Sequence, residues 1–375
     1  MNRQETSAWK RLVQYLLPGG WLILRGRRLQ GGLAGGLCLG TATLLILQWP
    51  EVFGAFQGSS PWDWFASLYL IGLFLTSFLL NAFWIGDSQI LNLLPLKQGF
   101  RRIRKNRTAI AGLIFLFLAY SIAILAPLVA PHDPIAQEDV LRLRLLPPSL
   151  ESGFLLGTDA FGRGILSRMI FGARISLFIG FVAVGIAVIV GTAIGLVAGY
   201  FGGVTDSLLM RFVDLMLGFP RLFLILIIIA FTGPSILWTV LVLGLTGWMG
   251  LARIVRGETL SLREREYIQA ARALGIGTPA ILVRHLLPNL LPPIIVFAVL
   301  NMGNVILIEA GLSFLGLGVQ PPDPSWGNMV NLGRQFLMDA WWISTFPGLA
   351  IVGTVISFNL AGDGLQEAFD PKSQR

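Results

Sequence analysis

This chain of 375 residues is 54% hydrophobic and only 13% charged, which excludes an ordinary soluble globular protein, because such proteins carry about 25% charged residues. We therefore expect a polytopic membrane protein. The net charge of +8 does not indicate a nucleic-acid partner. If the apolar segments cross the membrane alternately, most of the 28 Lys and Arg residues fall on one side, as the positive-inside rule requires of the cytoplasmic side.

Eight apolar segments are long enough to cross a bilayer, which takes about 20 residues of helix. They comprise residues 31–49, 64–86, 108–130, 175–200, 207–231, 234–255, 290–316 and 343–368. With the basic stretches placed inside, we expect both the N-terminus and the C-terminus to be cytoplasmic.

Residues 1–96 differ in composition from the rest of the chain and precede the basic cluster Lys97–Arg107. We expect them to form an appended module with two spans. The module can stabilise the fold, contact a partner or serve as an anchor, and the sequence does not choose among these roles. Cys38 is the only cysteine, so no disulfide or multi-cysteine zinc site can form within one chain.

The middle of the chain contains a long hydrophilic segment and an unusual span. Pro131–Arg174 is the hydrophilic segment and falls outside. Within the span 207–231, Arg211 and Asp214 are three residues apart and are expected to pair on one helix face. Pro220 is expected to kink the same helix.

A charged, alanine-rich stretch interrupts the spans in the C-terminal half of the chain. Ser261–Leu274 consists of strong helix formers, and Gly275 and Gly277 are expected to end that helix in a tight turn. Thr278 is expected to cap a second helix, and Pro288 to close the unit before the next span. From these residues alone, two interpretations are equally favoured. One is a hairpin that is held by a partner protein, and the other is an ordinary interfacial loop helix.

Polar residues within the spans are functional candidates, because the membrane makes them costly. Glu309 is the clearest, and Asn301 shares its helix face, with Asn304 near the edge of that face. We expect these side chains either to line a pathway through the membrane or to form a hydrogen-bond network between helices. Close helix packing is expected at four glycines, which are Gly195, Gly199, Gly202 and Gly203.

No nucleotide or metal site of a known pattern occurs in the chain. A phosphate-binding loop of the GxxxxGK[ST] type needs a lysine after a glycine, and none of Lys10, Lys97, Lys105 and Lys372 follows one. His132 and His285 fall on opposite sides of the membrane and cannot share a metal. We therefore expect no catalytic residue, metal or cofactor in this chain, and any ATP hydrolysis to belong to a partner.

The charged stretch and several other segments resemble a known family. Gln269-Ala270-Ala271, followed by Gly275 and by His285, Leu287 and Pro288, has the spacing of the EAA loop in integral-membrane subunits of ABC importers. Further motifs are "HDP" at 132–134, "LGTDAFGRGILSR" at 156–168, "GYFGG" at 199–203, "SFLGLGVQPPDPSWGNM" at 313–329 and "FNLAGDGLQEAFDP" at 358–371. Over about residues 97–371 the chain is similar to the dipeptide/oligopeptide/nickel permease family, and to its DppC/OppC-like member.

The resemblance implies an all-α polytopic membrane protein. Its core would be a type I ABC importer permease of six transmembrane helices, with two extra N-terminal spans. The implied parts are the extension 1–96, a family-like span and external loop at 97–174, and the permease core 175–371 with the EAA-type loop at 263–289. The implied location is the bacterial cytoplasmic membrane.

The same resemblance implies a translocation subunit for di- and oligopeptides, with nickel or another small solute as the alternative cargo. The implied partners are a homologous second permease in a heterodimer, two cytoplasmic subunits that bind ATP and Mg, an external solute-binding protein and membrane lipid. The loop would dock in a groove of an ATPase subunit. The residues implied in docking are Glu266, Gln269, Ala270, Ala271, Gly275, His285, Leu287 and Pro288.

Three departures from the family pattern stand out. Gln269 replaces the usual Glu, and Glu266, three residues earlier on the same face, can supply the carboxylate. Gly164 replaces the usual Asp after "GR", and residues 1–96 have no counterpart. Rival functions fit less well, because a membrane enzyme or signalling scaffold would need a catalytic cluster, and a passive channel has no use for the hairpin.

Overall fold

The computed structural model describes residues 103, 106–137 and 139–369, and within these ranges the secondary structure is helical, without a β-strand. The helices of eight or more residues are α8 (Arg107–Ile124), α11 (Ile165–Phe201), α12 (Gly203–Gly218), α13 (Arg221–Thr232), α14 (Ile236–Leu245), α15 (Met249–Arg263), α16 (Glu266–Ala273), α18 (Leu287–Phe314), α19 (Trp326–Gly333) and α20 (Trp342–Phe369). The short helical segments are α9 (Ala126–Val129), α10 (Val140–Leu143), α17 (Thr278–Ala280), the π-helix η1 (Ile281–Leu286) and the 3₁₀ turn η2 (Arg334–Phe336).

Five helical stretches are long and apolar enough to cross a membrane. They are Arg107–Ile124, Ile165–Phe201, Ile236–Arg263, Thr278–Phe314 and Trp342–Phe369. The pair α12 and α13, bent by 81°, makes a sixth if it is one span. The all-α polytopic fold is therefore confirmed for the described core, while the predicted spans 31–49 and 64–86 lie outside the described residues.

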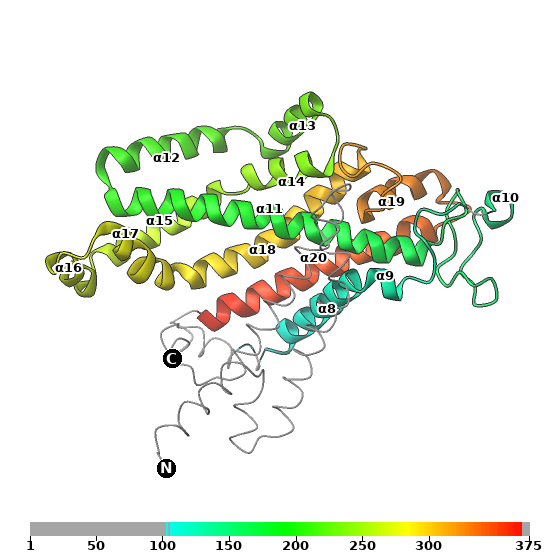
Figure 1. The fold of residues 1–375 in the computed structure, drawn as a ribbon, viewed down its shortest axis with the longest axis horizontal. Coiled ribbons are helices and arrows are strands. Elements are labelled where there is room, and N and C mark those ends of the chain that lie inside the picture. The colour runs from blue at the N-terminus through cyan, green and yellow to red at the C-terminus, as the bar shows by residue number, and fades with distance from the viewer. Residues whose placement is uncertain (1–102, 104–105, 138, 370–375) are drawn as a thin grey trace, which may run out of the picture. The chain divides into compact units, whose positions relative to one another are not determined.

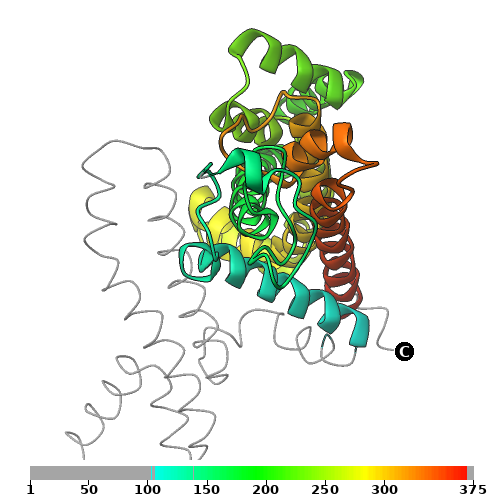
Figure 2. The same cartoon turned by 90° about the vertical axis from the view of Figure 1, so that its right-hand side faces the viewer.

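Helix α11 lies in the middle of the bundle and packs against α8, α14, α15 and α18, while α20 lies beside α8 and α18 (Figures 1 and 2). A Cβ added to Gly195 would lie 2.5 Å from the carbonyl oxygen of Ala252, and one added to Gly199 would lie 2.6 Å from Cβ of Thr259. The close packing predicted for these two glycines is thus confirmed. Gly202 ends α11 with a φ of 66°, and a Cβ added there would lie 2.8 Å from Nη1 of Arg263. The close packing predicted for Gly203 is wrong, because nothing lies within 4 Å of a Cβ added there.

The α12–α13 segment differs from its prediction in its ion pairs. The break predicted at Pro220 is confirmed, because this residue directly precedes α13. The predicted pair of Arg211 with Asp214 is wrong. Asp214 instead accepts from Arg253 at 2.5 Å between Oδ1 and Nη2, because α15 packs against α12 and presents an arginine from a neighbouring helix.

The charged hairpin also differs from its prediction. The expected single helix 261–274 is interrupted after Arg263, and α16 begins at Glu266. Thr278 is not a cap, because Gly277 occupies the capping position of α17 and no side chain caps it. Pro288 does not end the unit, since it lies in the first turn of α18, where a missing N–H costs nothing. The second half of the hairpin is therefore continuous with the next span.

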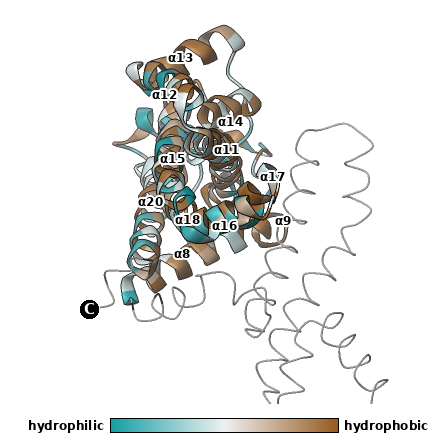
Figure 3. Cartoon of the chain, turned by 90° about the vertical axis from the view of Figure 1, so that its left-hand side faces the viewer, coloured by the Kyte–Doolittle hydropathy of each residue, from teal (hydrophilic) through white to brown (hydrophobic). Residues whose placement is uncertain are grey.

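The long helices bring two hydrophilic regions to opposite ends of the bundle. Helix α16 lies at one end, whereas α10 and α19 lie at the other (Figure 1). Coloured by hydropathy, α13 and α14 are mostly hydrophobic and α16 carries hydrophilic residues (Figure 3). The charged hairpin and the segment 131–164 are thus separated by the length of the bundle.

Candidate coupling site and membrane pathway

The inner face of α16 is anchored in the bundle. Ile268 and Ala271 are buried at 0% and 4% exposure, in one apolar cluster with Val255 of α15, Leu286 of η1 and Leu290 of α18. Ile268 and Ala271 are three residues apart, so their side chains lie on the same face of the helix. Burial of this face holds α16 against three neighbouring elements, and leaves the opposite face free.

The predicted docking residues separate into two groups in the structure. An outer group is exposed on α16 and its C-terminal turn, and comprises Glu266, Gln269, Ala270 and Gly275. An inner group is buried or half-buried and comprises Ala271, His285, Leu287 and Pro288. The outer group forms one edge that a partner can reach, whereas the inner group belongs to the support of that edge.

Gly275 ends α16 in a Schellman motif. Its N–H donates to the carbonyl of Arg272 at 3.0 Å, and the N–H of Ile276 donates to the carbonyl of Ala271 at 3.1 Å. The φ of Gly275 is 75°, a conformation that costs an L side chain about 1–2 kcal/mol. A Cβ added here would meet no atom within 4 Å, so any steric demand beyond the backbone must come from another molecule.

Several apolar side chains of the hairpin are exposed, and two of them, Leu274 and Ile276, adjoin this glycine in the sequence. Leu274 is 81% exposed and Val283 is 60% exposed, and Tyr267 and Ile276 are also exposed. An apolar group in a charged, hydrophilic region is typical of a protein contact surface. The turn at Gly275 thus carries both the backbone shape and the apolar character of a docking surface.

Two contacts between the hairpin and α11 were not found from the sequence. The guanidinium of Arg272 lies over the ring of Tyr200, 4.6 Å from its centroid, and Nη1 of Arg263 donates to the carbonyl of Gly199 at 3.0 Å. The "GYFGG" motif supplies both partners on α11, but only the folded chain brings it beside α16. These contacts connect the exposed edge with the central helix.

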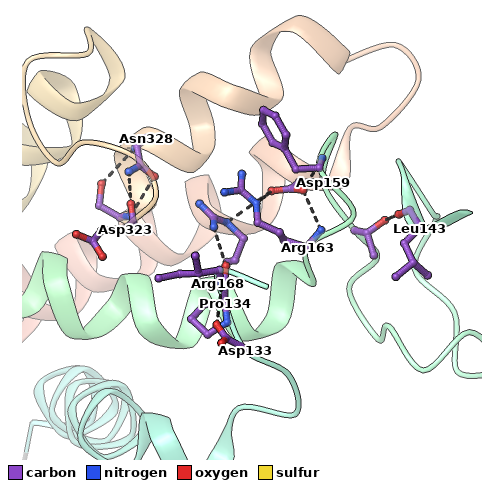
Figure 4. Close-up of polar contacts among 12 residues, drawn as sticks. Asp133, Pro134, Leu143, Asp159, Arg163, Arg168, Asp323 and Asn328 are labelled. Carbon is purple, nitrogen blue, oxygen red and sulfur yellow. Dashed lines mark hydrogen bonds and ion pairs between the residues drawn. The ribbon is translucent and has the colours of Figure 1, made fainter. Parts of the chain in front are cut away.

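The opposite end of the bundle contains a buried cluster of charges (Figure 4). Asp159, Arg163 and Arg168 are all buried. The Asp159 carboxylate accepts from Nε of Arg163 at 2.7 Å and lies 3.7 Å from Nε of Arg168, whose Nη1 donates to the carbonyl of Pro134 at 2.8 Å. Partial burial raises the pKa of the nearby Asp323 carboxyl, and the positive charge of Arg168 opposes that shift.

The predicted pathway residues of α18 do not share one environment. Asn301 and Glu309 are buried, as their common face predicts, but Asn304 is exposed on another face. The Ser313 hydroxyl donates to Oε1 of Glu309 at 2.7 Å, a bond within α18 that does not test the expected network between helices. A pathway role for Asn301, Asn304 and Glu309 stays a prediction.

No group of three or more His, Cys, Asp or Glu side chains in the described part of the chain is placed to hold a metal ion. His132 instead stacks on Phe154, with ring centroids 4.7 Å apart.

Comparison with known proteins identifies the family. The family of binding-protein-dependent transport system inner membrane components matches residues 191–375, and the N-terminal TM domain of oligopeptide transport permease C matches residues 95–148. The boundary expected at residue 96 stays a prediction, because it concerns a module outside the described residues.

Curated relatives agree with this match. The dipeptide transport system permease protein DppC of Alkalihalophilus pseudofirmus is 44% identical over 278 residues, which cover 74% of this chain and 90% of the relative. A di/tripeptide transport system permease protein of Pseudomonas aeruginosa is 43% identical over 282 residues, covering 74% and 92%. The DppC protein of Bacillus subtilis is 41% identical over 280 residues, covering 74% and 86%.

Permease subunits of this kind work with separate ATPase subunits, which hydrolyse the ATP, so this chain is a translocation subunit and not an enzyme. It is a multi-pass protein with several apolar helices. The chain belongs to the family of binding-protein-dependent transport system inner membrane components, as a DppC/OppC-like permease subunit of an ABC importer.

Proposed function

We propose that this permease subunit translocates di- and oligopeptides, and that an ATPase subunit in the cytoplasm drives it by holding the outer edge of α16. The observation that carries the coupling role is the division of α16 into two faces. Ile268 and Ala271 anchor the inner face in the core, while Glu266, Gln269 and Gly275 are exposed. A helix so anchored can be moved by a partner without separating from the bundle.

The contacts behind α16 supply a route for the movement. Arg272 contacts Tyr200 and Arg263 contacts Gly199, so a displacement of α16 acts directly on the end of α11. Helix α11 packs tightly on α15 and moves with it as one body. Closure of two ATPase subunits around bound ATP and Mg would thus shift α11 and α15 together. Coupling through two discrete arrangements of packed helices is the usual physical basis of such transitions.

The other proposed partners meet the chain elsewhere. At the end opposite α16, Leu141, Leu150 and Met338 are 96%, 83% and 97% exposed, and such apolar groups support contact with an external solute-binding protein. Exposed apolar residues of α8, such as Phe117, suit membrane lipid. A homologous second permease completes a heterodimer, and both termini of this chain are cytoplasmic.

The cargo is proposed from the relatives, whose names specify dipeptide and di/tripeptide transport. The experiment is uptake by proteoliposomes that contain the full complex with loaded binding protein. A labelled dipeptide should accumulate when ATP is supplied, and Ni²⁺ at the same concentration should not. Uptake of Ni²⁺ without uptake of peptide would favour the alternative cargo.

Orientation has its own test. In a Cys38→Ser background, Ser152→Cys should react with a membrane-impermeant thiol reagent in intact cells, because the segment 131–164 is proposed to face outward. Thr278→Cys, in the hairpin, should react only after the membrane is permeabilised. Labelling of Thr278→Cys from outside would reverse the proposed orientation.

A further inference from the structure

Arg221 is the only ionisable residue between Leu215 and Ala252. It is the first residue of α13 and lies at the break between α12 and α13, beside the second break, between α14 and α15 (Figure 1). Both breaks belong to stretches apolar enough to cross a membrane. A cation held in an apolar stretch is costly and marks a functional site by default.

The contacts of Arg221 orient its guanidinium without neutralising it. Nε donates to Oγ1 of Thr246 at 3.3 Å, and Nη2 donates to the carbonyl of Leu243 at 3.1 Å. The Nη2 atom also fills the space beside Gly247, where an added Cβ would lie only 3.0 Å away. Both acceptors are uncharged. A guanidinium has five N–H donors, so most of them are left for another acceptor.

The arginines of α15 give the contrast. Arg253 pairs with Asp214, and Arg256 forms a bidentate pair with Asp206, at 2.5 and 2.6 Å. For Arg221, no carboxylate of the described residues lies within ion-pair distance. Among the described residues, no carboxylate therefore neutralises the charge of Arg221, although its guanidinium is half-buried.

The depth of Arg221 argues against a lipid headgroup as that anion. If the Asp206–Arg256 ion pair lies at the surface of the hydrocarbon core, the ten residue steps from Arg256 back to Thr246 place Thr246 about 15 Å deep. That is about half of a 30 Å core. Lipid phosphates lie at the surface of that core. Arg221 is half-buried, and its neighbours Phe219 and Leu222 are exposed, so a solute within the transporter can approach it.

We infer that Arg221 binds a carboxylate of the transported cargo as the cargo passes the two helix breaks. The inference rests on the proposed peptide function, because a peptide carries a C-terminal carboxylate. Arginine suits this role because its planar donors match a carboxylate bidentately. Broken helices whose irregular backbone lies within the membrane are also where transporters place their substrate sites. Arg221 is thus a specificity-determining residue that lies outside the EAA-type loop.

The test uses the full complex in proteoliposomes with loaded binding protein. Uptake is measured for a dipeptide and for the same dipeptide as its C-terminal amide, in Arg221→Gln, Arg221→Lys and the parent. The matched control is Leu222→Gln, which introduces the same polar group at the next, exposed position. Each variant is compared with the parent for the same peptide, so any preference of the binding protein cancels.

We expect Arg221→Gln to lower uptake of the free dipeptide about tenfold, the scale for losing one hydrogen-bonded charged group, and to leave uptake of the amide nearly unchanged. Arg221→Lys should fall between Arg221→Gln and the parent, and Leu222→Gln should resemble the parent. Leu222→Gln should also keep the subunit stoichiometry and the basal ATP hydrolysis of the parent.

Several results would overturn the inference. Equal rates of dipeptide uptake by Arg221→Gln and Arg221→Lys would mean that Arg221 only stabilises the packing of the two helix breaks. An equal loss for dipeptide and amide would exclude a carboxylate contact. Loss of the second permease from purified Arg221→Gln complexes would assign the anion to that subunit. A parent complex that carries no peptide would contradict the proposed function itself, whereas normal peptide uptake by Arg221→Gln contradicts only this inference.

Discussion

The two ends of the described bundle each carry a sequence motif, but the two motifs use their polar residues in opposite ways. At the α16 end, Glu266 and Gln269 are exposed. At the other end, the charged residues of "LGTDAFGRG" are buried and contact one another. One motif presents its side chains to other molecules, and the other motif holds its own chain together.

A motif in this fold serves either its own chain or another molecule, according to whether its side chains are buried or exposed. Asp159 accepts from the backbone N–H groups of Phe161 and Arg163 at 2.8 and 3.0 Å, so its carboxylate shapes the loop before α11. Gly275 makes only the turn that ends α16, and the space around it is open. Substitutions at the Asp159 end should therefore change stability. Substitutions at the α16 end should change activity at constant stability.

The largest expected effect is the loss of Asp159. Asp159→Ala leaves Arg163 and Arg168 buried without their carboxylate. Breaking a buried ion pair from one side costs about 3–5 kcal/mol, so the free energy of unfolding of the purified chain in detergent should fall by that amount.

The matched control is Asp139→Ala. Asp139 and Arg142 form an exposed pair in the same segment 131–164, 3.8 Å apart, and exposed pairs contribute about 0–1 kcal/mol. Equal effects of the two substitutions would contradict the structural role assigned to the buried cluster.

The second effect concerns Gly275→Asp. We expect it to lower peptide uptake more than tenfold, a change of about 1.4 kcal/mol or more, because a charged side chain enters the proposed docking surface. Abundance and membrane insertion should stay near normal, since a Cβ added at Gly275 meets no atom of the chain within 4 Å. The measurement is uptake together with ATP hydrolysis stimulated by loaded binding protein.

Gly153→Asp provides a control for backbone strain. Gly153 has a φ of 77° and equally open surroundings, but lies in the segment 131–164 at the other end of the bundle. It should suffer the same local strain and still bind the ATPase subunit. Full stimulated hydrolysis and normal uptake in Gly275→Asp would leave the hairpin as an interfacial loop and remove the mechanical basis of the proposed coupling.

Patterns that act locally along the chain were predictable. Glycine at 275 specifies a helix end whatever surrounds it, and Pro220 breaks its helix because the ring removes a donor. The apolar spans within the described residues followed from length and composition alone. The family spacing from Gln269 to Pro288 then identified the hairpin.

Contacts that depend on the packing of distant segments were not predictable. Asp214 had a suitable local partner in Arg211, but the fold supplied Arg253 from another helix. The sequence predicts that Pro288 closes the hairpin before the next span, because a proline usually ends a helix. At the first turn of α18 it is tolerated, and the π-helix before it carries the chain through.

A smaller effect is expected where the hairpin contacts α11. Arg272→Gln removes the cation over the Tyr200 ring, a contact of about 0.5–1 kcal/mol when exposed. We expect two- to fivefold less peptide transported per ATP hydrolysed, at about the scale of that energy. Tyr200→Phe keeps the ring and should behave as the parent, whereas Tyr200→Leu should resemble Arg272→Gln. An unchanged ratio of uptake to hydrolysis in Arg272→Gln would show that this contact does not transmit movement.

The smallest effect separates the two polar residues on the outer edge of α16. Gln269 donates from Nε2 to the carbonyl of Glu264 at 3.1 Å, so its amide is partly engaged within the chain. Gln269→Glu loses that donor but introduces the carboxylate usual in the family, and uptake should change less than about twofold, below 0.5 kcal/mol.

Glu266→Ala should lower uptake more than Gln269→Glu does, because Glu266 is exposed on the same face and is proposed to supply the charged contact to the ATPase. Glu264→Ala is the control, since Glu264 already pairs with Arg263 at 2.9 Å and lies before α16. Binding of the purified ATPase subunit to each variant gives the measurement. If Glu264→Ala weakens binding as much as Glu266→Ala, the charge of the region matters and the position on the edge does not.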